Sequence, residues 1–270
     1  MYRLIVSDLD GTLLREDHTL SDYTKEVIHR VSEQGIEFML ATGRIFGGAK
    51  KYARQLNLNT PILACNGALI KEADGSLVYG RPLQDKALGE VFRLLTSKDL
   101  YFHCYGEESF FTKQFPGSLA SFYALDKGVP DEDRFPLVEI DPMELVGKET
   151  IYKVLARCEG EENRRELYGF LSEIDGVSVT VSWHNSFDIC ADQVSKANAI
   201  DRYAKEKGIL PSEIICFGDN FNDIDMIEYA GLGITLENGV QEIKETADYV
   251  TFSNNEDGVA RAIMKFVFGE

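Results

Sequence analysis

The stretch YRLIVSDLDGT, residues 2–12, decides the fold of this chain of 270 residues. Tyr2 to Ser7 form a short apolar run, which is typical of a strand buried in a parallel sheet. The run stops at an Asp-Gly turn that holds Asp8 and Asp10. Because ligands bind beyond the carboxyl ends of parallel strands, we expect this turn to be a functional loop.

Strand and helix patterns alternate outward from this stretch. Ser21 is a suitable N-cap for a helix that Gly35 ends, and a second helix runs from Lys196 to Lys207. Further strands are predicted at Ile36–Leu40, Ile62–Ala64 and Ile214–Phe217, each a short apolar run. The alternation predicts an α/β fold, with a doubly wound, Rossmann-like parallel sheet as its core.

The rhythm changes in the middle of the chain. Ala68–Lys71 and Ser76–Tyr79 flank an Asp-Gly turn and predict a β-hairpin. Beyond it, strand-like segments are mixed with helices until the doubly wound pattern returns. We therefore expect a core domain built from residues 1–82 and 188–270, with residues 83–187 inserted as a smaller α+β cap domain.

Composition excludes several classes of protein. The chain has 44% hydrophobic and 27% charged residues with only 7 prolines, which is ordinary for a globular protein. Its formal charge of −17 opposes binding to nucleic acid and to anionic membranes. No apolar run is long enough to span a bilayer, and we expect a cytoplasmic protein. The five cysteines are widely spaced, and we expect buried free thiols.

Polar side chains suited to phosphoryl chemistry follow the predicted strands or begin the next helix. Folding should gather these candidate catalytic and metal-binding residues at one edge of the sheet: Asp8, Asp10, Thr42, Lys196, Asp219 and Asp223. Crowded carboxylates repel one another unless a cation neutralises them, and hard oxygen ligands select Mg²⁺. We expect Mg²⁺ to be held by Asp8, Asp219 and a backbone carbonyl, with Asp223 as a ligand or as support.

Each residue of this set has a chemical role available to it. Asp8 can attack phosphorus and form an aspartyl phosphate. Asp10 can protonate the leaving oxygen and later activate water, which requires a carboxyl group with a raised pKa. Thr12 can hydrogen-bond the nucleophile loop, while Thr42 and Lys196 face the phosphate and offset its charge.

These motifs resemble those of the haloacid dehalogenase superfamily, in order and over nearly the whole chain. Motif one is Asp8 to Thr12, motif two begins at Thr42, motif three is Ser195-Lys196, and motif four is Gly218 to Asp223. The long insertion resembles the type IIB cap, also called C2B, of the Cof-like sugar-phosphate phosphatases. The segments Asn66-Gly67 and Asn255 to Val259 add to the resemblance.

The resemblance implies a Mg²⁺-dependent phosphatase that acts on small phosphorylated metabolites, hexose phosphates among them. Asp8 would be the nucleophile, Asp10 the acid/base and, through its carbonyl, a metal ligand. The candidate substrate-binding residues, some by resemblance and some by position, are Thr12, Gly43, Arg44, Asn66, Gly67, Asn222 and His184. One departure is Ala197, where relatives usually have glycine; if that glycine serves a special backbone conformation, we expect the helix start that carries Lys196 to differ slightly.

Two other functions use similar chemistry. A phosphoacceptor signalling module also gathers carboxylates, Mg²⁺, threonine and lysine, but it needs no inserted domain and gives Asp10 no task. A phosphomutase would return isomerised sugar phosphate in place of free phosphate. Neither the physiological substrate nor the oligomeric state can be read from the sequence.

Overall fold

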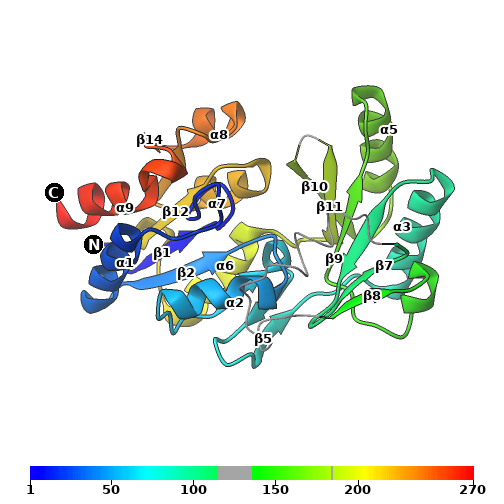
Figure 1. Cartoon of the computed structure of the whole chain (residues 1–270), viewed down its shortest axis with the longest axis horizontal. Helices are drawn as coiled ribbons and strands as arrows, with labels where there is room; N and C mark the ends of the chain where they lie inside the picture. Colours follow the sequence, from blue (N-terminus) through cyan, green and yellow to red (C-terminus); the bar gives the residue numbers. More distant parts are fainter. Residues whose placement is uncertain (115–135, 184) are drawn as a thin grey trace.

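The computed structural model describes residues 1–114, 136–183 and 185–270, and in these residues the strands form two sheets (Figure 1). The larger sheet has the order β14-β13-β12-β1-β2-β3-β4-β5. Its strands are β1 (Leu4–Ser7), β2 (Glu37–Ala41), β3 (Ile62–Ala64), β4 (Leu69–Lys71), β5 (Leu77–Gly80), β12 (Ile214–Gly218), β13 (Leu232–Leu236) and β14 (Tyr249–Thr251). The strands from β14 to β3 are parallel, and β4 and β5 form the predicted antiparallel hairpin.

The predicted opening strand lies at the centre of this sheet. All four residues of β1 are buried, and they pair in parallel with β12 on one side and β2 on the other. Alternate residues of the strand enter different cores: Ile5 faces one apolar cluster, whereas Leu4 and Val6 face another. Burial on both faces explains why the strand reads as a continuous apolar run.

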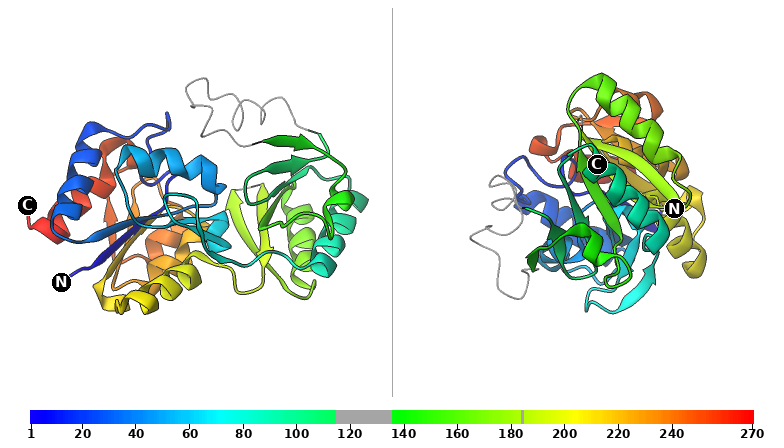
Figure 2. Two further views of the ribbon diagram at one scale, coloured as in Figure 1. Left: turned by 90° about the horizontal axis from the view of Figure 1, so that it is seen from below. Right: turned by 90° about the vertical axis from the view of Figure 1, so that its right-hand side faces the viewer.

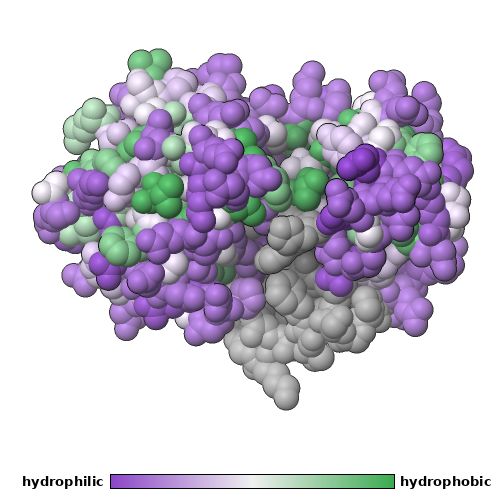
Figure 3. Space-filling model, turned by 90° about the horizontal axis from the view of Figure 1, so that it is seen from above, coloured by the Kyte–Doolittle hydropathy of each residue, from purple (hydrophilic) through white to green (hydrophobic). Residues whose placement is uncertain are grey.

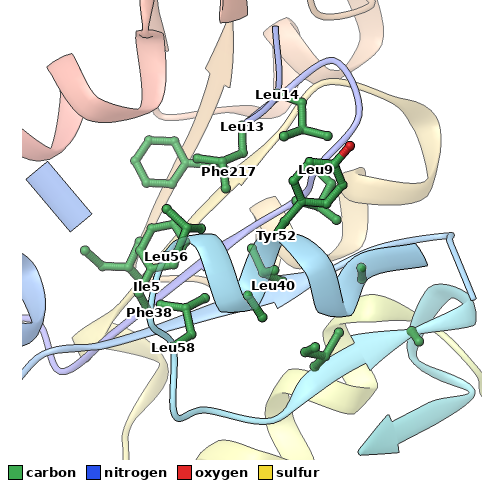
Figure 4. Close-up of a cluster of buried hydrophobic side chains, with 14 of the residues drawn as sticks. Ile5, Leu9, Leu13, Leu14, Phe38, Leu40, Tyr52, Leu56, Leu58 and Phe217 are labelled. Carbon is green, nitrogen blue, oxygen red and sulfur yellow. The ribbon is translucent and has the colours of Figure 1, made fainter. Parts of the chain in front are cut away.

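Helices cover both faces of the larger sheet, which confirms the doubly wound fold. On the face of Ile5 lie α1 (Asp22–Glu33), α2 (Phe46–Gln55) and α9 (Gly258–Ile263), the last continued by a π-helical turn at Met264–Phe268. On the other face lie α6 (Lys196–Lys207), α7 (Ile224–Tyr229) and α8 (Gln241–Thr246). Figure 4 shows the first cluster, to which Tyr52 of α2, Leu9 and Leu40 all belong.

The helix ends follow the sequence signals. The Ser21 hydroxyl accepts a hydrogen bond from the Thr24 N–H at the start of α1, as an N-cap should. Ser195 does the same for α6 through the Asn198 N–H, and Gly208 ends α6 with left-handed dihedrals. These caps fix the position at which Lys196 begins its helix.

The smaller sheet has the order β10-β11-β9-β6-β7-β8. Its strands are β6 (Phe102–Tyr105), β7 (Phe110–Thr112), β8 (Leu137–Glu139), β9 (Lys153–Arg157), β10 (Val177–Trp183) and β11 (Ser186–Ala191). One face packs on α3 (Asp85–Ser97) and α5 (Glu161–Ser172), with Val154 and Ile189 in that core. The opposite face lies against the larger sheet's strand ends, since Tyr105 and Leu155 join the core cluster there (Figure 2).

The chain crosses from the larger sheet to the smaller one and later returns. The return crossing does not coincide with the expected boundary between residues 187 and 188. That boundary falls inside β11, because Ser186–Ala191 is one continuous strand of the smaller sheet. The first crossing lies between β5 and α3. We propose that the inserted domain extends to Ala191. Across the two crossings, Arg81 Nε donates to the Asp192 carbonyl oxygen at 2.7 Å.

The surface and the cysteines agree with the composition. Hydrophilic residues cover most of the face shown in Figure 3. All five cysteines fall in the described part of the chain, where they are free and buried as predicted. Burial raises the pKa of the Cys65 thiol to about 12. Among the residues that the structure describes, no helix is both long and apolar enough to cross a membrane.

Candidate active site

The carboxyl ends of β1, β2 and β12 meet where the larger sheet faces the smaller one, as Figure 1 shows. A cavity of about 370 Å³ opens there, within the range usual for small-molecule sites. The core lines it with Asp8, Asp10, Gly11, Arg15, Glu16, His18, Thr42, Gly43, Arg44, Asn220, Asn222 and Asn254, and the cap with Tyr105, Lys153, Leu155 and Asp188. Segments far apart in the sequence thus meet at one place.

Three carboxylates crowd beside this cavity. Asp8, Asp219 and Asp223 each offer an oxygen, and these oxygens all lie within 4.8 Å of one another. Burial raises the pKa of Asp8 to about 7 against the opposing pull of Lys196, with Asp223 and Asp10 adding repulsion. The pKa of Asp219 is also raised, first by burial and then by the charge of Asp8. The three carboxylates therefore repel one another, and a bound cation would reduce this repulsion.

Lys196 lies buried between two of these carboxylates. Its Nζ donates at 2.6 Å to Asp8 Oδ1 and at 2.6 Å to Asp223 Oδ1. Both contacts raise the pKa of Lys196, although burial alone would lower it. The ammonium therefore binds Asp8 without being among the residues that line the cavity, whereas we expected it to face the phosphate.

The loop after β12 is tied together by Asp223. Its second oxygen accepts the backbone N–H groups of Asp219 and Asn220, each at 3.1 Å. The Thr12 hydroxyl donates to Asp219 Oδ1, and Gly11, at φ +81°, leaves no room for a side chain beside the same carboxylate. Thr12, expected among the substrate contacts, is buried and holds Asp219 in place.

Asp10 differs from the expectation. Arg44 donates to both oxygens of its carboxylate, from Nε at 2.6 Å and from Nη2, and His18 Nδ1 lies 3.4 Å away. Burial would raise the pKa of Asp10, but these partners outweigh it and hold the pKa well below its usual range. The predicted raised pKa of Asp10 is therefore wrong for this arrangement. Arg44, which lowers it, lies 34 residues away in sequence, so the motif around Asp10 does not show the contact.

The second motif and the turn after β3 are also linked. The Thr42 hydroxyl accepts the Arg44 N–H at 3.1 Å, and Lys153 of the cap donates to the Gly43 carbonyl oxygen at 2.6 Å. Asn66 donates to Asp188 of the cap at 2.7 Å and accepts from Asn222 at 3.0 Å. Thr42, Gly43, Arg44 and Asn222 line the cavity, so the structure brings together most of the expected residues.

Gly67 and Ala197 serve the start of α6. Gly67 is not among the residues that line the active-site cavity, and it lies with Ser195 at a separate one. Its φ is +90°, and a Cβ there would stand 2.5 Å from the Ser195 carbonyl oxygen and 2.8 Å from Ala199 Cβ. Ala197 needs no left-handed backbone, and its N–H donates to Asp225 at 3.2 Å. The helix start thus accommodates alanine.

We expect Gly67→Ala to lower the free energy of unfolding by about 2–4 kcal/mol, through backbone strain and overpacking against α6. The matched control is Gly35→Ala, which has φ +74° but meets nothing within 4 Å. In that control only backbone strain should act, and it should lower the free energy of unfolding by about 1–2 kcal/mol. Urea unfolding of both variants measures the difference, and equal losses would show that close packing against Ser195 has no role.

Some residues of the site escape sequence reasoning. Lys153 and Leu155 face the cavity because alternate residues of β9 point to the same face of the sheet. The sequence shows this alternation, but it does not show which of the two faces is turned to the cavity. Arg15 reaches the cavity and donates to both oxygens of Asp257, which lies in the predicted segment Asn255 to Val259. His184, expected as a substrate contact, lies outside the described residues.

Comparisons with known proteins identify the family of this chain. The family model described as haloacid dehalogenase-like hydrolase matches residues 5–263. A Bacillus subtilis protein named 5-amino-6-(5-phospho-D-ribitylamino)uracil phosphatase YwtE is 30% identical over 287 aligned positions, which cover 99% of each chain.

Solved structures show the same fold. A haloacid dehalogenase-like hydrolase from B. subtilis superposes with a TM-score of 0.87 at 24% identity, covering 98% of this chain and 99% of that one. A subclass IIB sugar phosphatase of the superfamily superposes with a TM-score of 0.83 at 22% identity, covering 98% and 99%. The family match over almost the whole length, together with the 30% identical relative, shows that this chain belongs to the haloacid dehalogenase-like hydrolases and carries the inserted α+β cap of the Cof-like members.

Proposed function

We propose that this enzyme is a Mg²⁺-dependent phosphatase that hydrolyses small phosphorylated metabolites through an aspartyl phosphate on Asp8. The observation that carries the proposal is the Asp8 carboxylate, which lines a small cavity while Lys196 binds one of its oxygens. Lys196 leaves Oδ2 as the attacking atom. The names of the relatives support a phosphatase, and the family supports hydrolysis.

The carboxylate cluster fits Mg²⁺. Asp8 and Asp219 would hold the ion together with the Asp10 carbonyl, and Asp223 would orient the loop or add a ligand. Raised pKa values at Asp8 and Asp219 mark a buried site with excess negative charge. When bound, Mg²⁺ would neutralise this charge and polarise the phosphate oxygens.

Metal removal gives a direct prediction. Chelation should abolish phosphate release, Mg²⁺ should restore it, and Ca²⁺ should restore little, because Ca²⁺ prefers more ligands at longer distances. Mg²⁺ at about 100 times its dissociation constant should also stabilise the fold by about 2.7 kcal/mol. Thermal unfolding of the wild type and of Asp219→Asn tests this, since the variant should gain much less. Equal gains would exclude Asp219 as a ligand.

Two displacements complete the reaction. Asp8 attacks phosphorus and the alcohol leaves with a proton from Asp10; water activated by Asp10 then hydrolyses the aspartyl phosphate. Asp10 is paired with Arg44 in this structure, which favours its ionised form but occupies both of its oxygens, so the base step also requires Arg44 to release it. To act first as the acid, Asp10 must gain a proton, which requires Arg44 to turn from Asp10 toward the substrate.

The organic part of the substrate would lie between the two sheets. The cap contributes Lys153, Asp188 and Tyr105 to the cavity wall, and the core contributes Arg15 and Glu16. Charged side chains of both signs suit a ligand rich in hydroxyl groups, since hydroxyls donate and accept. Sugar phosphates are therefore the class we propose.

A screen of phosphorylated sugars, nucleotides, pyridoxal phosphate and flavin mononucleotide tests the function. Purified protein with Mg²⁺ should release inorganic phosphate, with the highest kcat/KM on a sugar phosphate. Isomerised sugar phosphate without free phosphate would show a phosphomutase. A stable phosphoprotein without turnover would show a phosphoacceptor module. Either result would contradict the proposal.

A further inference from the structure

A chain of hydrogen bonds runs from the cap sheet to the loop of the fourth motif. Asn66 Nδ2 donates to Asp188 Oδ2 of β11 at 2.7 Å, and Asn222 Nδ2 donates to Asn66 Oδ1 at 3.0 Å. Asp188 and Asn66 are both buried, whereas Asn222 lines the cavity. The chain, called here the amide relay, therefore connects a cap residue to a wall of the active site.

The relay has a fixed direction. The two ends of an amide group have nearly the same shape, so packing alone does not choose between them. A carboxylate can only accept hydrogen bonds, so Asp188 turns the nitrogen of Asn66 toward itself. The oxygen of Asn66 then faces Asn222 and selects its nitrogen. The charge of Asp188 thus sets the orientation of both amides.

Asp188 is itself held in place. Lys153 Nζ lies 3.1 Å from Asp188 Oδ1 and donates to the Gly43 carbonyl oxygen at 2.6 Å. A Cβ on Gly43 would stand 3.0 Å from Asn66 Oδ1 and 3.4 Å from Lys153 Nζ, so glycine lets these groups approach. The buried ion pair connects cap to core and fixes the origin of the relay.

We propose that Asp188 and Asn66 are positioning residues. Through them, contact between the cap sheet and the core orients Asn222 at the phosphate site. Asp188 reaches Asn66 only when the cap sheet rests on the core, and Asn222 is then held with its NH₂ group fixed. Asn222 Nδ2 donates one N–H to Asn66, which leaves its second N–H for the phosphate. A reversed amide would place its oxygen there and repel the anion. This inference rests on the proposed function, because it takes Asn222 as a phosphate contact.

An exchange of the two residue types tests the relay. In Asp188→Asn, position 188 no longer determines which end of the Asn66 amide faces it. In Asn66→Asp, two carboxylates face each other. We expect each single variant to lower kcat/KM by about 10–100-fold, which is the size expected from a misplaced contact.

The double variant has the same composition and charge as the wild type. In it the carboxylate introduced at position 66 would accept hydrogen bonds from the amide introduced at position 188 and from Asn222. The oxygen of that new amide would accept from Lys153 in place of the Asp188 carboxylate. We therefore expect its activity to return to within about 10-fold of the wild type.

The affinity for inorganic phosphate, measured by calorimetry, separates this inference from the proposed function. Phosphate should bind more weakly to the single variants than to the wild type, with recovery in the double variant, even if no tested phosphoester is hydrolysed. The matched control is Lys71→Gln, which removes another contact between core and cap, to Glu107 at 2.9 Å and to Glu108 at 2.6 Å.

The control should leave phosphate affinity unchanged, because Lys71 has no part in the relay. The inference is overturned if phosphate binds equally to all of these proteins or to none. It is also overturned if the double variant is no better than the worse single variant. Since the double variant is compared directly with the wild type, the test holds even if a single variant fails to fold.

Discussion

Asp8→Asn should reduce kcat by about 10⁴-fold or more, because it removes the proposed nucleophile. The amide keeps the shape of the side chain, and its oxygen can still accept the hydrogen bond from Lys196. One of the three crowded carboxylates also loses its charge. We therefore expect the metal-free variant to fold at least as stably as the wild type. Steady-state kinetics with thermal unfolding of the same samples measures both effects.

The control for this variant is Asp17→Asn, which changes an exposed aspartate outside the cavity. It should have wild-type kcat and KM. If Asp8→Asn kept even a tenth of the wild-type kcat, direct attack by water would replace the covalent route. If Asp8→Asn failed to fold, the account of crowded charge at this site would be wrong.

Lys196→Met should have the largest effect on stability. The ammonium is fully buried and binds both Asp8 and Asp223, so its loss leaves buried anions without their partner. Removing one partner of a buried ion pair costs about 3–5 kcal/mol. Activity should fall about 10²–10³-fold, because Asp8 loses the group that orients it. Urea unfolding and steady-state kinetics measure these losses, and Mg²⁺ should recover part of the stability.

Lys205→Met is the matched control on the same helix. Lys205 is largely exposed and pairs with Asp201 at 2.6 Å, so its removal should change stability little. A similar loss in both variants would mean that Lys196 acts only through general packing of α6. Wild-type activity in Lys196→Met would exclude its support of Asp8.

Local patterns were enough to predict the edge of the sheet at which the carboxylates meet. The run before Asp8 reads as a buried strand because β1 is covered on both faces, and Ser21 and Gly35 mark a helix through capping chemistry that depends on neighbouring residues alone. The rule for parallel strands then brings Asp8 and Asp219 together. Each of these steps uses a signal that lies within one short segment.

The features that the sequence did not reveal depend on contacts between distant segments. The pKa of Asp10 is set by Arg44 and His18, and the motif alone does not show that they meet it. Lys153 reaches the site only because the cap sheet turns one face to the core. The cap end that we propose differs from the expected boundary because β11, Ser186–Ala191, crosses that boundary as one strand.

The most direct test is to trap the phosphoryl group during turnover. Wild-type enzyme hydrolysing p-nitrophenyl phosphate with Mg²⁺ is quenched in acid within milliseconds and digested, and its peptides are analysed by mass spectrometry. The account predicts one phosphoryl group, on Asp8. A phosphoryl group on another residue, or an unmodified Asp8 during a burst of p-nitrophenol, would contradict it.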